Sequence, residues 1–203
     1  MKGRTANDPS WNPDLDFCGF PLARSALDQA IASIPELDAN SCPPGATTSE
    51  VEALGKALRT DASDKAILDF SESVCIWGGG QGRRVWGNLR KRNSSRLAEL
   101  LRAWLRNMDP AATYASAIAG GTTIDGLGVS FASKHLRMLD PTRFAVLDSV
   151  LSEKLGFALN SNGYALFMRN LCEFKQRIGF EQNIATLEYG IYELVQQAVR
   201  QRR

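Results

Sequence analysis

The stretch GLGVSFASKHLRMLDPTRFAVLDS, residues 126–149, decides the fold that this sequence predicts. It opens with Gly126 and Gly128, continues as a helical pattern from Ser130, and ends at Asp148 after an apolar run. Because the two glycines have no Cβ, the chain can approach a phosphate closely, and the N–H groups at the start of a helix can bind it. Many unrelated turns contain Gly-x-Gly, so the turn gains weight only from the residues that follow it.

The rest of the chain is predicted to be helical as well. Apolar residues recur at helical spacing, whereas alternating runs of β-branched residues are scarce. Ser49 and Glu52 have the spacing of a capping box for a helix to about Arg59, and Pro35 with residues 38–49 predicts a loop. Further helices are expected at 22–34, 64–76, 95–107, 110–119, 148–156, 161–178 and 183–201.

These patterns predict an all-α chain with one domain. A length of 203 residues suits a single hydrophobic core. Residues 1–20 contain prolines and little periodicity, and we expect them to form an N-terminal arm packed on the domain. Residues 21–203 then form one helical domain, with a helical hairpin near 111–139.

Composition indicates a globular protein without a metal centre. The chain is 44% hydrophobic and 23% charged, no apolar run approaches the ~18 residues of a membrane span, and the first residues lack the apolar core of a signal peptide. The cysteines at 18, 42, 75 and 172 are too far apart for a CxxC pair, and the chain has one histidine. We therefore expect no metal, no cofactor and a cytoplasmic protein with reduced thiols.

Positive charge is concentrated in one stretch, although the formal net charge is only +2. Residues 81–106 contain one acidic side chain, Glu99, against eight basic ones: Arg83, Arg84, Arg90, Lys91, Arg92, Arg96, Arg102 and Arg106. Such a local field favours a polyanion such as nucleic acid, where phosphate contacts dominate affinity. The alternative is a solvated helix face without a partner.

A glycine-rich segment, WGGGQGRRVWG at 77–87, lies between Trp77 and Trp86. One interpretation is a loop that enters DNA, with Arg83 and Arg84 on the phosphates and a tryptophan stacking on a base or filling a gap. The other is a pair of core tryptophans on either side of a tight glycine turn. The sequence leaves both open.

Residues 124–150 resemble the helix-hairpin-helix DNA glycosylases, in particular the 8-oxoguanine branch. Ile124, Gly126 and Gly128 fall on the hairpin of that superfamily, Ala132 falls on the small residue of its second helix, and Phe144–Asp148 fall on the segment that leads to its catalytic acid. The resemblance implies a two-lobed helix-hairpin-helix fold. It also implies an enzyme that flips a nucleotide out of the duplex and breaks its N-glycosidic bond.

The resemblance implies that Asp148 is the catalytic carboxylate, which stabilises positive charge on the sugar or activates water. Asp148 also precedes a predicted helix, where an aspartate commonly acts as an N-cap. The two roles are compatible.

The superfamily's nucleophilic lysine is the main departure, because Ser130 occupies that position here. The resemblance therefore implies a monofunctional enzyme that acts through water. Lys134 lies one turn further along the same helix face. It is a candidate for a base-pocket residue, for a relocated nucleophile with weak lyase activity, or for a surface lysine.

We therefore expect a monomeric DNA glycosylase of the nucleoid that acts on duplex DNA carrying a damaged or modified base, with no membrane partner. Asp148 and Lys134 would be the catalytic residues. DNA binding would fall to Gly126, Gly128, Ser130, Arg83, Arg84, Arg90, Lys91 and Arg92. The alternatives are a non-catalytic helix-hairpin-helix DNA-binding protein and a helical protein-interaction module.

Overall fold

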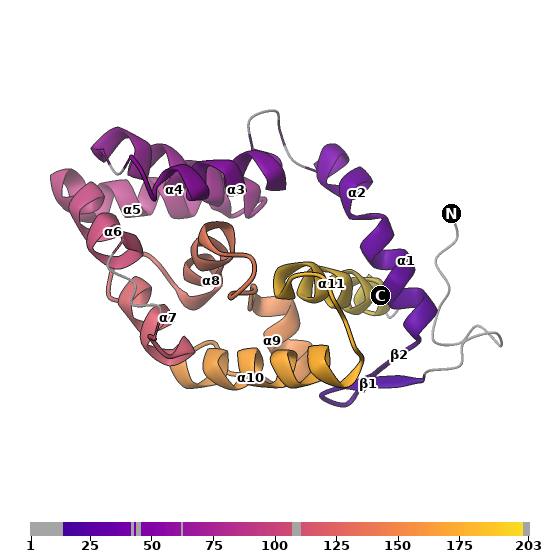
Figure 1. Cartoon of the computed structure of the whole chain (residues 1–203). Coiled ribbons are helices and arrows are strands. Elements are labelled where there is room, and N and C mark those ends of the chain that lie inside the picture. The colour runs from indigo at the N-terminus through magenta and orange to yellow at the C-terminus, as the bar shows by residue number, and fades with distance from the viewer. Residues whose placement is uncertain (1–13, 42, 44–45, 62, 107–110, 201–203) are drawn as a thin grey trace.

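The structure, a computed structural model, describes residues 14–41, 43, 46–61, 63–106 and 111–200. Helices dominate it, which confirms the all-α prediction (Figure 1). The helices are α1 (Arg24–Ala32), α2 (Ile34–Ser41), α3 (Thr48–Ala57), α4 (Asp64–Trp77), α5 (Gly82–Asn93), α6 (Leu97–Arg106), α7 (Tyr114–Thr122), α8 (Val129–Leu139), α9 (Ser149–Leu155), α10 (Ser161–Arg177) and α11 (Ile184–Arg200), with a 3₁₀ turn η1 at Ser94–Arg96. None of the described helices is long and apolar enough to cross a bilayer.

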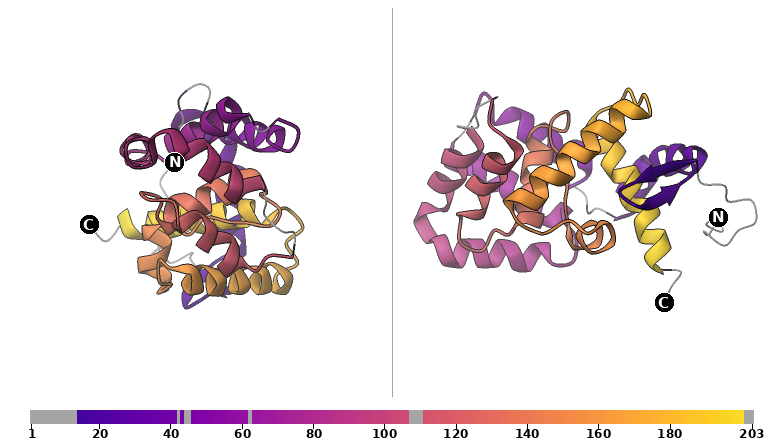
Figure 2. Two further views of the ribbon diagram at one scale, coloured as in Figure 1. Left: turned by 90° about the vertical axis from the view of Figure 1, so that its left-hand side faces the viewer. Right: turned by 90° about the horizontal axis from the view of Figure 1, so that it is seen from below.

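Helix α8 lies in the middle of the molecule, between two groups of helices (Figure 1). On one side it packs against α3 and α4, which are joined there by α5 and α6. On the other side it packs against α7, which leads on to α10, α11 and α9. The first helix, α1, packs on the last one, α11, so both ends of the described chain belong to the same group (Figure 2).

A short β-hairpin precedes the helices, where the sequence predicted only an arm. Strands β1 (Leu15–Phe17) and β2 (Phe20–Leu22) pair in an antiparallel register around a Cys18–Gly19 turn, in which both residues have positive φ. Phe17 is 2% exposed and its ring lies 5.1 Å from that of Phe174 on α10. Residues 1–13 of the predicted arm lie outside the described residues.

Two local predictions were wrong. The loop predicted from Pro35 contains α2, because a proline is tolerated in the first turn of a helix, where its missing N–H has no partner to lose. The capping box uses Thr47 and Glu50 instead of Ser49 and Glu52. The Glu50 carboxylate accepts a hydrogen bond from the Thr47 N–H at 2.9 Å, so α3 begins two residues earlier than predicted.

His135 is a core residue at the centre of α8, with no exposed surface. Its Nδ1–H donates to the Phe131 carbonyl at 2.7 Å, so its Nε2 accepts from the Ser71 hydroxyl at 2.7 Å. Both contacts suit the neutral ring, and burial lowers the pKa of His135 to about 4.

The free energy of unfolding is therefore expected to fall as the pH drops from about 6.5 to about 4. In this window the unfolded chain protonates its histidine while the folded chain cannot, which costs about 1.4 kcal/mol per pH unit. Urea unfolding of the parent and of His135→Gln at pH 7, 5.5 and 4.5 measures this loss. The variant is expected to lose less stability over the window, and equal losses in both proteins would contradict the assignment.

Candidate functional site

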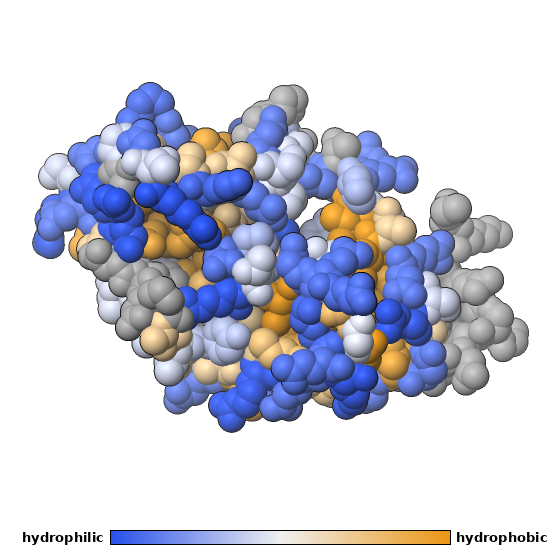
Figure 3. All heavy atoms as spheres, viewed as in Figure 1, coloured by the Kyte–Doolittle hydropathy of each residue, from blue (hydrophilic) through white to orange (hydrophobic). Residues whose placement is uncertain are grey.

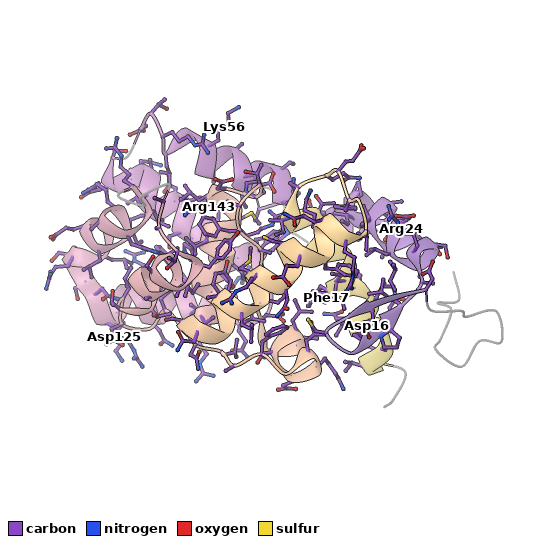
Figure 4. All side chains as sticks on the ribbon, turned by 60° about the horizontal axis from the view of Figure 1, so that its bottom comes forward. Asp16, Phe17, Arg24, Lys56, Asp125 and Arg143 are labelled. Atoms are coloured by element: carbon purple, nitrogen blue, oxygen red, sulfur yellow. The ribbon has the colours of Figure 1, made fainter. Side chains whose placement is uncertain are left out.

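The hairpin joins α7 to α8 through residues 123–128. Gly126 has φ +91°, a conformation that other residues rarely adopt, and a Cβ there would stand 3.4 Å from the Arg92 side chain of α5. Arg92 forms an ion pair with Asp125 at 2.7 Å, and the Asn93 amide donates to the Asp125 carbonyl at 2.9 Å. The hairpin is thus fixed against the end of α5, and Figure 4 shows Asp125 at the edge of the molecule.

Four of the five exposed basic side chains of α5 lie on one face of that helix. Arg83, Arg84, Arg90 and Lys91 are seven residues apart in pairs, hence two turns apart, and we call them the basic stripe. The stripe runs from the start of α5 to the end that contacts the hairpin. The structure therefore brings two separate sequence signals, the basic stretch and the Gly-x-Gly turn, onto adjoining surface.

The remaining basic residues of 81–106 lie elsewhere. Arg92 forms an ion pair with Asp125, Arg102 forms one with Asp64, and Arg96 lies in η1, after the end of α5. Arg106 is at the end of α6, where it lines a cavity described below. Only part of the stretch thus contributes to the stripe.

Residues 144–147, in the connection between α8 and α9, are buried and non-helical, and side chains from three helices bind their backbone. Glu188 of α11 accepts the Val146 N–H at 3.2 Å, and Ser133 of α8 accepts the Leu147 N–H at 3.1 Å. Tyr164 of α10 donates its hydroxyl to the Ala145 carbonyl at 3.0 Å. Backbone groups of a buried, non-helical segment need such partners. Together these three hydrogen bonds fix the position of the residue that follows the segment.

That residue is Asp148, at the N-terminus of α9. Its Oδ1 accepts the Leu151 N–H at 3.0 Å, so it is the N-cap of this helix, as one of the two interpretations proposed. The side chain is partly exposed, and its charge opposes the lowering of the Lys134 pKa that burial causes. The capping role and a role in chemistry therefore remain compatible.

Lys134 is buried on α8, with 8% of its surface exposed, which rules out the surface alternative. Its Nζ donates to the Ser130 hydroxyl at 3.2 Å and lies 5.0 Å from the centre of the Phe131 ring. Burial lowers the pKa of Lys134, against the opposing effects of Asp148, Glu188 and Cys75. Burial is the largest of these effects, because nearly the whole side chain is removed from water.

The first glycine of the glycine-rich segment lies against this lysine. A Cβ on Gly78 would stand 2.6 Å from the Phe131 ring and 3.1 Å from Cδ of Lys134, so no larger residue fits there. From Gly78 the chain makes a short turn into α5, which begins at Gly82 and carries the basic stripe. The loop is thus shorter than predicted, and it connects Lys134 to the stripe.

The two tryptophans are not placed as the DNA-entering interpretation requires. Trp86 is 8% exposed and belongs to the core. Trp77 is half-buried, donates to the Thr48 hydroxyl at 2.9 Å, and lies under the guanidinium of Arg137 at 5.3 Å. Arg137 in turn forms an ion pair with Glu52 at 2.6 Å. These contacts favour the interpretation as packed tryptophans on either side of the turn.

Two further residues of the site, Glu188 and Tyr192, were missed by the sequence reasoning. Both are on α11, one turn apart, about 40 residues after Asp148. Burial raises the pKa of Glu188 to about 8 and, with the charge of Asp148, raises the pKa of Tyr192 to about 12. An acid on the apolar face of α11, between Ile184 and Ile191, was the available signal for Glu188. We call Ser130, Lys134, Asp148 and Glu188 the polar cluster.

A cavity of about 470 Å³ lies away from the polar cluster. It is formed where α3, α6 and α8 end, with Arg59, Arg106 and Arg143 around an apolar floor. Arg59 and Arg106 lie at helix C-termini, where cations are favoured, and Arg143 donates to the Ala112 carbonyl, so these arginines have structural reasons to be there. Figure 4 shows Arg143 well separated from Asp125 of the hairpin, which places this cavity apart from the hairpin surface.

Comparison with known proteins gives a family. Residues 36–197, which include the hairpin and the whole polar cluster, match the family described as "Putative 8-oxoguanine DNA glycosylase OGG-like protein". No curated protein and no solved structure matches the chain. The family description indicates a DNA glycosylase-type function with DNA as substrate. The chain belongs to this OGG-like family, a branch of the helix-hairpin-helix glycosylase superfamily, as the resemblance of residues 124–150 predicts.

Proposed function

We propose that the protein excises a damaged or modified base from duplex DNA, with Asp148 as the catalytic carboxylate. The observation that carries the proposal is the burial of Lys134 within the electrostatic influence of Asp148, which follows a segment whose backbone is bound by side chains of three helices. A protein seldom buries a lysine without an ion pair unless the site uses it, because desolvation of the charge is costly. The family and the neighbouring basic stripe supply the substrate class.

In the proposed reaction the N-glycosidic bond breaks and its electron pair leaves with the base. Positive charge then develops on the sugar, and the Asp148 carboxylate stabilises it. Water adds its hydroxyl to the sugar carbon and the departing base takes up a proton in its place, so the products are a free base and an abasic strand. Lys134 contacts the flipped base, where a group that can give a proton assists the departure of the base.

Ser130 supports hydrolysis over strand cleavage, because its hydroxyl cannot form an imine with the sugar. The lowered pKa of Lys134 supports a second candidate, weak lyase activity, since a neutral amine is a competent nucleophile. The non-catalytic alternative offers no reason to hold Lys134 and Glu188 out of water next to Asp148. On the face shown in Figure 3, apolar residues appear as separate strips between polar ones, which lends little support to a protein-docking module. The detection of abasic sites after incubation with modified duplexes tests the proposal.

DNA binding is expected to depend on the basic stripe and on salt. The logarithm of the binding constant should fall with the logarithm of salt concentration, with a slope of about −0.9 per neutralised phosphate. Arg90→Glu with Lys91→Glu should weaken binding to all sequences alike and make the slope shallower. Fluorescence anisotropy at several salt concentrations measures both effects.

Arg106→Glu is the matched control, since Arg106 belongs to the same basic stretch of sequence but lies at the cavity. It is expected to bind DNA nearly as the parent does. Equal losses from the stripe variant and from Arg106→Glu would show that overall charge, and not the stripe, governs binding.

A further inference from the structure

Glu188 is the group in the site that the proposed chemistry leaves unused. It is 3% exposed, and its side chain accepts the Val146 N–H, two residues before Asp148. None of the ion pairs among the described residues includes it. A buried carboxyl without a direct cationic partner is unusual, because burial disfavours its charged form.

We propose that Glu188 is a positioning residue for Asp148, and that it holds the 144–147 segment in place while it carries a proton. The inference rests on the proposed function, since it assumes that Asp148 acts on the substrate. As a neutral group Glu188 can bind the Val146 N–H without a counter-ion. As an anion it would attract the nearest cations, Lys134 and Arg137, away from their present contacts with Ser130 and Glu52.

The surrounding groups support this assignment. The titratable groups that interact electrostatically with Glu188 are Lys134 and Arg137 of α8, Asp148 at the start of α9, Tyr164 of α10 and Tyr192 of α11 itself. On another side of α11, helix α1 contributes the apolar side chains of Leu27 and Ile31, which lie near Gly190. The charged Arg24 and Asp28 of α1 form an ion pair with each other near the surface.

The pKa of Glu188 also differs from those of the neighbouring titratable groups. Burial raises the pKa of Glu188 to about 8, whereas the pKa values of Cys75 and Tyr192 are about 12. Tyr164 also has a pKa well above its ordinary value. Burial lowers the pKa of Lys134, so this lysine is the group whose titration the test must distinguish from that of Glu188.

Excision measured as a function of pH tests the inference. The parent should lose activity above about pH 8, as Glu188 ionises. Glu188→Gln keeps an oxygen that accepts the Val146 N–H and cannot ionise, so it should excise at close to the parent rate at pH 7 and keep that rate at pH 9. Glu188→Ala frees the segment and should lose about 100-fold at every pH, because a small displacement of a catalytic group has effects of that size.

Tyr164→Phe is the matched control for the segment. It removes the hydroxyl that binds the Ala145 carbonyl but leaves Glu188 in place. It should be slower than the parent at all pH values and should retain the decline above pH 8. A decline that persists unchanged in Glu188→Gln would overturn the inference and assign the titration to Lys134.

A second measurement does not depend on activity. Since the folded-state pKa of Glu188 is raised above its ordinary value of 4.5, stability from this group is present at low pH and is lost as the pH rises towards 8. The urea midpoint of Glu188→Gln should therefore rise relative to that of the parent between pH 5 and pH 8. Glu153→Gln, which removes an exposed carboxylate of α9, should show the same change of midpoint with pH as the parent.

The outcomes separate this inference from the proposed function. If the parent excises a base but the midpoint of Glu188→Gln gains nothing with pH, the protonated Glu188 is refuted and the glycosylase stands. If the parent excises no base from any duplex, the positioning role falls together with the proposed function, even where the midpoints show that Glu188 carries a proton.

Discussion

Asp148→Asn is expected to lower base excision by on the order of 10³-fold or more, while the fold and the affinity for DNA are retained. The amide has the shape of the carboxylate but cannot stabilise the positive charge that develops on the sugar. Asparagine caps a helix about as well as aspartate, so the hydrogen bond to the Leu151 N–H survives. Excision is measured by gel after alkaline cleavage, folding by circular dichroism, and binding by anisotropy.

Asp140→Asn serves as the control for this substitution. Asp140 lies eight residues before Asp148, at the end of α8, and its side chain accepts hydrogen bonds from Thr142. It has no part in the proposed chemistry. It is expected to excise at the parent rate. If Asp148→Asn also excises at that rate, Asp148 is only the N-cap of α9.

Lys134→Gln is expected to lower excision by about 100-fold, the loss typical of a group that transfers a proton in the transition state. Glutamine is one bond shorter than lysine and carries a neutral N–H donor on the side of the Ser130 hydroxyl, so α8 should remain intact. Lys154→Gln, on the exposed surface of α9, removes a lysine from outside the polar cluster and should leave excision unchanged. Equal rates for Lys134→Gln and the parent would remove Lys134 from the site.

Borohydride reduction during turnover distinguishes the two possible roles of this lysine. Hydrolysis through water predicts no covalent adduct between protein and DNA. An adduct that forms in the parent and vanishes in Lys134→Gln would show imine chemistry and would contradict the monofunctional assignment.

The hairpin and most helices could be predicted because their signals are local. The glycines of 126–128 and the 3.6-residue periodicity of α8, α10 and α11 act within one element, so the sequence alone contains them. The bounds of α8 and α10 differ from the predicted ones by a single residue at one end. The placement of Asp148 before α9 was equally local.

The errors arose where contacts between distant segments decide the structure. The glycines of 77–87 favour a loop, but α5 already begins at Gly82. A Cβ at Gly82 would stand 1.6 Å from the Cys75 carbonyl oxygen. This glycine thus serves close packing. Glu188 was missed because its role depends on Val146, 42 residues earlier in the chain. Tertiary contacts of this kind leave no pattern in a single sequence beyond an acid among apolar residues.

The most direct test of the proposed activity is incubation of the protein with duplexes that each carry one modified base, among them oxidised purines, alkylated bases and enzymatically modified bases. Alkali then cleaves any abasic site, and the strands are resolved on a gel. The account predicts a cleaved strand from at least one duplex with the parent protein, and none from that duplex with Asp148→Asn. Salt-sensitive binding to all duplexes without an abasic product from any of them would contradict the account and would establish a non-catalytic DNA-binding protein.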